Sequence, residues 1–221
     1  MEVSAILLHT ALFQGISRQE LPALLTQLNA RRRQYDKGAA ILHRGDQTAR
    51  LGLVLSGTVH MVKEDFWGAR TIVGLARPGE VFAESYACLP GAVLEVSVLA
   101  ATDTEILFLD AAPALSGGAG GAQFSRNLLA MLAGRNLTLT RKIGHMARRS
   151  IRDKLLSYLS AQAMQAGGPE FDIPLDRQQL ADYLAVDRSA LSTALGKLRG
   201  EGVLTFRKNH FCLLQKLEHT D

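Results

Sequence analysis

The chain has 221 residues, of which 47% are hydrophobic and 21% charged, with a net charge of +4, which is typical of a globular and not of a disordered protein. Every apolar run is broken by glycine or charge before about 18 residues, so we expect no membrane-spanning helix. The N-terminal segment carries an acid, Glu2, and lacks the basic residues with which a secretion signal begins, so we expect no signal peptide. The two cysteines, Cys88 and Cys212, are too few for a disulfide framework or a four-thiolate iron–sulfur cluster, which favours a reducing cytoplasm.

The first part of the chain contains two kinds of pattern. The first thirty residues are expected to be helical, because leucines recur there at helical spacing. From Arg31 onwards, short runs of Val, Ile and Leu alternate with glycine-containing turns, at 39–46, 50–63, 70–82 and 94–110. Closely spaced short strands of this kind predict an all-β sandwich or barrel.

A long helix is predicted from Gln123 to Met146, after a glycine-rich break at 116–122. Residues spaced alternately by three and four form a heptad seam along it, with Asn136 at an a position, where a single Asn can fix register and two-strandedness. The seam predicts a dimer; the alternative is an amphipathic helix that packs on its own domain. The seam consists of Leu129, Leu132, Asn136, Leu139, Ile143 and Met146.

Positive charge is concentrated in the middle of the chain. Residues 126–154 hold eight basic residues and one acid, for a net +7, whereas residues 1–125 carry −2 and residues 155–221 carry −1. This segment is either a solvated helix face or a surface that faces a polyanion. In the second case we expect Arg148, Arg149, Arg152 and Lys154 to supply much of the nonspecific attraction.

The C-terminal third predicts a small domain of helices and a hairpin. One amphipathic helix covers 150–165, a loop with a short strand covers 167–175, and two helices joined by a short turn occupy 176–202. Residues 203–214 then alternate around a polar tip, Arg207 to His210, as a β-hairpin would.

The two helices of this domain have the pattern of a helix-turn-helix. Apolar residues form the buried stripe, Val186 closes the turn, and the small Ala181 lies where the helices must cross. The opposite face of the second helix carries Arg188, Ser189, Ser192 and Thr193, which can reach base edges and phosphates in a major groove. The hairpin would be the wing. The alternative is an ordinary pair of antiparallel helices.

Several segments resemble the CRP/FNR family of transcription regulators, and together they span nearly the whole chain: ILHRGD, LGLVLSGTVHMV, RPGEVFAES, SVLAATDTEILFLD and DRQQLADYLAVDRSALSTALGKL. The resemblance implies an α+β fold with an N-terminal effector-sensing β-roll of double-stranded jelly-roll type (1–120), a central dimerisation helix (121–147) and a C-terminal winged helix-turn-helix (148–221). It also implies a cytoplasmic homodimer that binds a near-palindromic operator in double-stranded DNA and contacts RNA polymerase.

The resemblance assigns individual DNA contacts. Arg188 and Ser189 lie where the family reads bases, and Thr193 replaces an arginine of many members. Arg177 and Gln178 are matched to phosphate and positioning contacts, and Lys208 to a wing contact.

The resemblance also locates an effector pocket but argues against cyclic AMP. Glu84 matches the family's ribose-binding glutamate, but the phosphate-clamping Arg-Ser pair falls on Leu94 and Glu95, which cannot bind a phosphate diester. One alternative is a small organic effector held by Glu84, Ser85, Glu95 and Thr140. Others are no effector at all, or haem with an axial ligand among His43, Cys88, His145 and Met146.

No enzyme is predicted from the sequence. It has no nucleophile–base constellation, no P-loop, no dinucleotide fingerprint and no metal-ligand spacing, and it assigns no cofactor. Cys88 has no obvious resolving partner for a redox role. The remaining alternative is a sensor module whose C-terminal helices contact only proteins.

Overall fold

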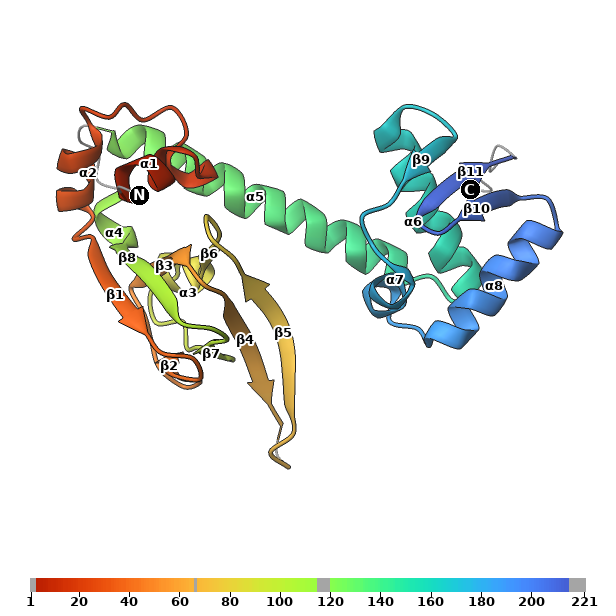
Figure 1. Cartoon of the computed structure of the whole chain (residues 1–221), viewed down its shortest axis with the longest axis horizontal. Helices are drawn as coiled ribbons and strands as arrows, with labels where there is room; N and C mark the ends of the chain where they lie inside the picture. Colours follow the sequence, from red (N-terminus) through yellow and green to blue (C-terminus); the bar gives the residue numbers. More distant parts are fainter. Residues whose placement is uncertain (1–2, 66, 115–119, 215–221) are drawn as a thin grey trace. The chain divides into compact units, whose positions relative to one another are not determined.

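The computed structural model describes residues 3–65, 67–114 and 120–214. Its contacts divide the chain into two compact units, 1–134 and 135–221, and Figure 1 colours their elements along the sequence. The α+β class predicted from the sequence is confirmed. Within the described part of the chain, no helix is both long and apolar enough to cross a lipid bilayer.

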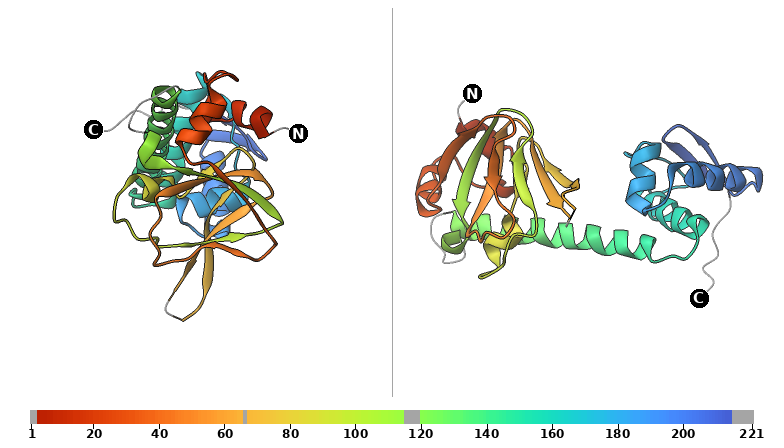
Figure 2. Two further views of the ribbon diagram at one scale, coloured as in Figure 1. Left: turned by 90° about the vertical axis from the view of Figure 1, so that its left-hand side faces the viewer. Right: turned by 90° about the horizontal axis from the view of Figure 1, so that it is seen from below.

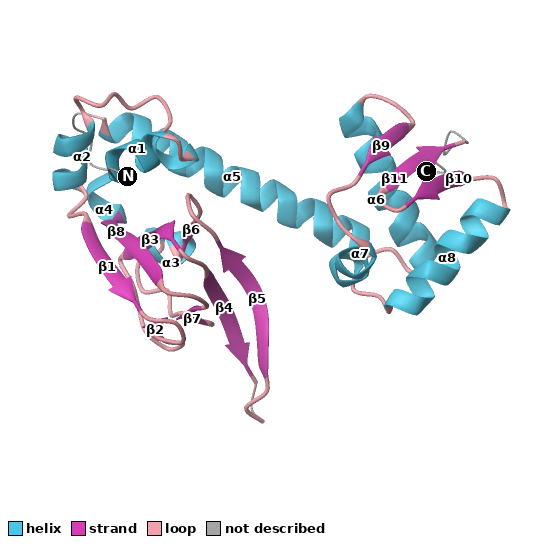
Figure 3. Cartoon of the chain, in the orientation of Figure 1, coloured by secondary structure: helices cyan, strands magenta, loops and turns pink. Residues whose placement is uncertain are grey.

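The first unit begins with helices and continues as two antiparallel sheets (Figures 2 and 3). One sheet has the order β1-β8-β3-β6 and the other β2-β7-β4-β5. The elements are α1 (Val3–Leu8), the 3-10 helix η1 (Ala11–Phe13), α2 (Leu21–Gln27), β1 (Arg31–Tyr35), β2 (Ala40–Leu42), β3 (Arg50–Ser56), β4 (Val59–Glu64), β5 (Arg70–Ala76), β6 (Val81–Phe82), α3 (Glu84–Cys88), β7 (Ser97–Ala100), β8 (Thr104–Asp110), α4 (Ala111–Ala114) and the start of α5 (Gly121–Met146).

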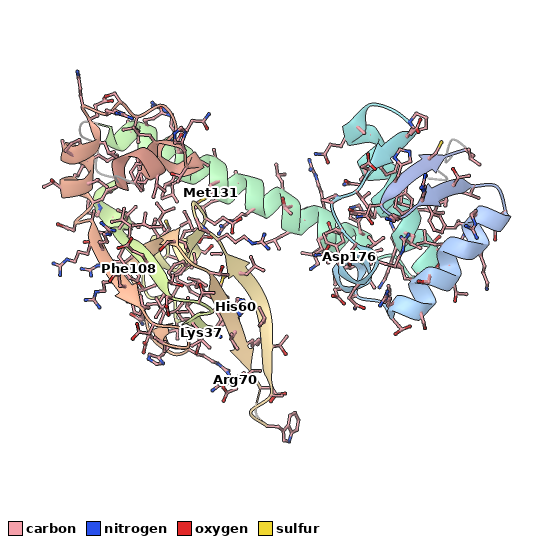
Figure 4. All side chains as sticks on the ribbon, in the orientation of Figure 1. Lys37, His60, Arg70, Phe108, Met131 and Asp176 are labelled. Atoms are coloured by element: carbon pink, nitrogen blue, oxygen red, sulfur yellow. The ribbon has the colours of Figure 1, made fainter. Side chains whose placement is uncertain are left out.

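The alternation of side chains along β3 explains why this unit has two hydrophobic layers. Leu51, Leu53 and Leu55 face one side and join a core with α2, η1 and the first turns of α5. Val54 faces the other side and joins Phe108 of β8, labelled in Figure 4, in a core between the two sheets. Strands buried on both faces read as continuous apolar runs, as β3 does.

Two glycines of β3 and the turn after it are required by close packing. A Cβ on Gly52 would lie 2.2 Å from the ring of Phe82. Gly57 has φ +81°, and its Cβ would lie 2.3 Å from the carbonyl oxygen of Asp103. Any larger residue would therefore have to displace a core ring or a backbone segment.

The helix α5 begins at Gly121, two residues before the predicted start, while 116–119 of the predicted glycine-rich break lie outside the described residues. Phe124 and Leu128 are buried in the first unit's core, but further along most apolar side chains of α5 are exposed. Of the predicted seam, Leu129, Leu139 and Ile143 are 68%, 59% and 66% exposed, and Asn136 is also exposed. Leu132 and Met146 are half-buried.

The second unit contains the end of α5, three further helices and the sheet β10-β11-β9. Ser150 caps α6 by accepting a hydrogen bond from the Asp153 N–H, and Gly167 ends the helix with φ +77°. The remaining elements are α6 (Ile151–Ala166), β9 (Glu170–Asp172), α7 (Arg177–Leu184), α8 (Arg188–Gly200), β10 (Leu204–Arg207) and β11 (His210–Leu213).

His145 fixes the last turn of α5 to the rest of this unit. The imidazole is buried, its Nδ1 lies 2.9 Å from Ser157 Oγ, and its ring packs edge-on against Tyr158 at 5.8 Å. Tyr183 of α7 completes the cluster, 6.3 Å from His145, and Lys142 Nζ lies 5.4 Å from the centre of the Tyr183 ring. Burial, followed by the positive charge of Arg148, lowers the pKa of His145.

Candidate nucleic-acid interface

The first helix of the predicted motif, α7, is set by local hydrogen bonds at both ends. Asp176, labelled in Figure 4, accepts from the Gln179 N–H at 2.8 Å, while the Gln179 side chain accepts from the Asp176 N–H at 2.9 Å. This reciprocal pair is a capping box. At the other end Ala185 has φ +50°, which closes the helix and turns the chain toward α8.

The second helix, α8, buries one face and exposes the other. Leu191, Leu195 and Leu198 are at most 1% exposed and pack with Leu180, Ala181 and Leu184 of α7. The exposed face carries the predicted polar set, Arg188, Ser189, Ser192 and Thr193. The predicted buried stripe and polar face are thus on opposite sides of α8.

Hydroxyl protons on this polar face are already used within the helix. Ser192 Oγ donates to the Arg188 carbonyl at 2.9 Å, and Thr193 Oγ1 donates to the Ser189 carbonyl at 3.0 Å. Their oxygen lone pairs remain able to accept from base amino groups such as cytosine N4 or adenine N6. Arg188 has the guanidinium that suits guanine O6 and N7.

The wing brings additional polar groups to the start of both helices. A hollow of about 480 Å³ is lined by residues from the start of α7, the start of α8 and the β10–β11 turn. Three of its residues are basic, which gives the hollow a positive character suited to phosphate. Its lining residues are Asp176, Arg177, Gln178, Arg188, Lys208 and Asn209.

Two predicted phosphate and positioning residues, Arg177 and Gln178, differ in their surroundings. Gln178 is exposed and its Nε2 donates to Asp182 Oδ1 at 2.9 Å. Arg177 is half-buried: its Nη2 donates to the Lys208 carbonyl at 3.0 Å, and its guanidinium lies 5.1 Å from the Phe206 ring centre and 5.5 Å from that of Phe211. Burial lowers the pKa of Arg177. The Arg177 side chain, which the resemblance matches to a phosphate or positioning contact, thus packs on the wing.

The basic residues that follow α5 differ in their partners. Arg152 forms an ion pair with Glu201, and Lys154 Nζ donates to the Leu184 carbonyl at 3.2 Å, which caps the end of α7. These two cations therefore stabilise the fold of the unit in addition to any attraction for DNA, whereas Arg148 and Arg149 are exposed.

Two residues of this surface were missed by the sequence reasoning. Asn209 lines the hollow, and Asp187 caps α8 by accepting from the Ser189 N–H at 2.8 Å and the Ala190 N–H at 3.0 Å. The Ser189 hydroxyl also donates to Asp187, and this hydrogen bond contributes most to lowering the pKa of the Asp187 carboxyl, followed by the bond from the Ala190 N–H. The sequence signals were the Asp before the helix and the Lys-Asn pair at the hairpin tip.

The predicted effector residues lie in different environments. Glu84 and Ser85 begin α3, where the Glu84 side chain is buried and Ser85 is exposed. Leu94 is 1% exposed, and its backbone pairs with the loop at 45–46, through Gly45 N–H to Leu94 O at 2.9 Å and Leu94 N–H to Asp46 O at 2.8 Å. Glu95 next to it is exposed.

The other effector candidates are spread over the two units. Thr140 is exposed on the part of α5 that belongs to the second unit, and its Oγ1 lies 3.5 Å from Asn136 Oδ1. Cys88 is half-buried, and burial together with the nearby Glu84 raises the pKa of its thiol, which disfavours the thiolate a redox sensor needs. His145, one of the four haem-ligand candidates, has its Nδ1 beside Ser157 and its ring against Tyr158. In the described residues, no three His, Cys, Asp or Glu side chains gather as a metal site would require.

Each of the two units contains a region that matches a known protein family. Residues 32–115 match the cyclic nucleotide-binding domain, and residues 153–219 match the Crp-like helix-turn-helix domain.

Individual proteins agree with these matches. A probable transcriptional activator of Rhizobium leguminosarum bv. viciae is 27% identical over 195 residues, which cover 78% of this chain and 72% of that protein. The catabolite activator protein of Thermus thermophilus is 28% identical, with a TM-score of 0.51 and coverage of 92% and 93%. The c-di-GMP-responsive global regulator CLP of Xanthomonas campestris shares the fold, with 20% identity, a TM-score of 0.53 and coverage of 90% and 100%.

These proteins are DNA-binding transcription regulators and not enzymes. With a cyclic nucleotide-binding domain followed by a Crp-like helix-turn-helix, this chain belongs to the CRP/FNR family of transcription regulators.

Proposed function

We propose that the protein is a homodimeric, sequence-specific regulator controlled by a small-molecule effector other than cyclic AMP. The observation that carries the proposal is the exposed polar face of α8 beside a hollow whose lining includes the exposed cations Arg188 and Lys208. Side chains that can read base edges thus lie next to cations that can bind phosphates.

The exposed face of α5 supports a dimer. Leu139 and Ile143 lie one helical turn apart, and both leave more than half of their surface in water. Exposed apolar side chains at heptad spacing are typical of a helix that pairs with a second copy of itself. Two recognition helices related by a two-fold axis would then read a near-palindromic operator, with half-sites about 34–36 Å apart.

The surroundings of Leu94 support an effector other than cyclic AMP. Its buried, uncharged side chain stands at the position that the resemblance matches to the family's phosphate-binding arginine, and Glu95 adds a negative charge beside it. An anionic phosphate diester would be repelled at such a site and would find no bidentate donor. A neutral or cationic organic molecule that contacts Glu84, Ser85 and Glu95 of the first unit fits these residues better.

RNA polymerase is the expected protein partner, because the Rhizobium relative is named a probable transcriptional activator. The cytoplasm is the expected location, because the operator DNA lies there. The domain limits 1–120, 121–147 and 148–221 are part of the same proposal.

Selection of binding sites from a random DNA library, followed by fluorescence anisotropy on the enriched sequence and on a scrambled version, tests the proposal. We expect an enriched two-fold-symmetric sequence that the wild-type protein binds at least about a thousandfold more tightly than the scrambled DNA. Equal affinity for both DNAs would refute sequence-specific binding. Sedimentation of the free protein tests the dimer independently.

A further inference from the structure

The turn at the tip of the wing has an unusual backbone conformation. Lys208 and Asn209 form the connection between β10 and β11, and Lys208 has φ +55°. Residues with a side chain rarely adopt this left-handed region, and such strain persists only where the surroundings hold it. A basic residue thus occupies a position for which glycine would be the ordinary choice.

Two hydrogen bonds from outside the hairpin hold this turn. The Arg177 Nη2 donates to the Lys208 carbonyl at 3.0 Å, and the Ile173 N–H donates to the Asn209 carbonyl at 2.9 Å. Both carbonyls of the turn are thereby bonded to groups that precede α8 in the sequence. These two contacts connect the wing tip to α7 and to the segment that precedes it.

The Arg177 side chain is itself fixed by aromatic rings on the wing strands. Its guanidinium lies over Phe206 of β10 and Phe211 of β11, and Phe206 is also contacted by Arg199 at 5.2 Å. Planar stacking and a directed N–H bond together need a guanidinium, because an ammonium group has neither the flat face nor the fork of donors. The Arg177 side chain therefore forms a structural link between α7 and the wing.

We propose that Arg177 is a positioning residue that holds the strained turn so that Lys208 presents its ammonium group to a DNA phosphate across the hollow from Arg188. Arg177 itself does not bind phosphate in this arrangement; its effect on DNA is transmitted through Lys208. This inference rests on the proposed use of α8 and the wing in DNA binding.

A double-mutant cycle distinguishes a structural role of Arg177 from a direct phosphate contact. In Arg177→Ala, Lys208→Ala and the double variant, the slope of log K against log salt should become less steep by about 0.9 in all three, and the affinity of the double variant should match that of the weaker single variant. Two independent phosphate contacts would instead give additive losses and a slope change of about 1.8 in the double variant. Additivity would overturn the proposal.

A conservative variant and a measurement without DNA complete the test. Arg177→Lys keeps the charge but loses the stack, so we expect it to bind DNA like Arg177→Ala; rescue to wild-type affinity would overturn the proposal. In the DNA-free full chain, hydrogen exchange at the Ile173 N–H should accelerate at least tenfold in Arg177→Ala and stay unchanged in Lys208→Ala, while thermal unfolding confirms that both variants fold.

Unchanged hydrogen exchange at the Ile173 N–H in Arg177→Ala would refute the claim that Arg177 holds the turn, whatever the DNA-binding measurements show. Fast exchange with unchanged DNA affinity would refute its role in binding. If the wild-type protein binds no DNA, the proposed function fails, and the exchange measurement still decides whether Arg177 holds the turn.

Discussion

Replacing Arg188 with alanine should identify the residue that reads bases. Arg188 is the first residue of α8, and its side chain is exposed on the rim of the hollow. The helix start is held by Asp187, and the Arg188 backbone carbonyl accepts from Ser192 Oγ. Neither contact uses the Arg188 side chain, and alanine is the best helix former, so the substitution should remove a DNA contact without weakening α8.

The size of the effect follows from the geometry of a guanidinium at a guanine edge. A bidentate contact is worth about 1–3 kcal/mol of discrimination, which corresponds to roughly 5- to 150-fold in affinity at 25 °C. We expect Arg188→Ala to lose this amount on the selected operator and much less on scrambled DNA. The preference for one base should weaken at one base pair of each half-site, while the base preference at the other positions of the operator stays unchanged.

Fluorescence anisotropy on the operator, its single-base variants and scrambled DNA measures this directly. Lys197→Ala is the matched control, because it removes one exposed positive charge from the last turn of the same helix. The control should lose little affinity, and equally on all sequences. If Arg188→Ala also loses equally on matched and scrambled DNA, Arg188 contacts only phosphate, and our assignment of base readout is wrong.

Three further predictions concern the dimer, the effector and pH. Asn136→Leu should keep the dimer but broaden the range of oligomers seen in sedimentation, since the polar a position no longer selects two strands; a wild-type monomer at micromolar concentration would contradict the seam. Calorimetry should detect no binding of cyclic AMP, and a micromolar dissociation constant would refute the effector proposal. His145, with its pKa lowered by burial, should contribute stability that is present above about pH 6.5 and is lost on acidification, so His145→Gln should flatten that loss. His210, with its pKa raised by Glu170 and Asp172, should contribute stability that is present below about pH 6.5 and is lost as pH rises through its folded pKa. In urea unfolding, His145→Gln should therefore lower the midpoint more at pH 8 than at pH 5, and His210→Gln more at pH 5 than at pH 8. The same pH dependence in both variants would contradict these assignments.

Local sequence signals were sufficient where neighbouring residues determine the structure. The turn between α7 and α8, the buried stripe on α8 and the hairpin after it follow from apolar spacing and end caps, which act over three or four residues. The runs with alternating or continuous apolar residues likewise formed strands of the two sheets. The strand β1 was not among the predicted runs, because its arginines carry no apolar pattern and it is stabilised by pairing with the distant β8.

By itself, the sequence determined the helix-turn-helix and the family, because these depend on residue identity and short spacing. Only the tertiary structure decided which groups the cations contact. Arg177 meets the wing 31 residues away, and Arg152 meets Glu201, 49 residues away. No local pattern distinguishes such an arginine from one that faces DNA, because the charge and the exposed stem are the same until folding brings a carbonyl, a carboxylate or an aromatic ring within reach.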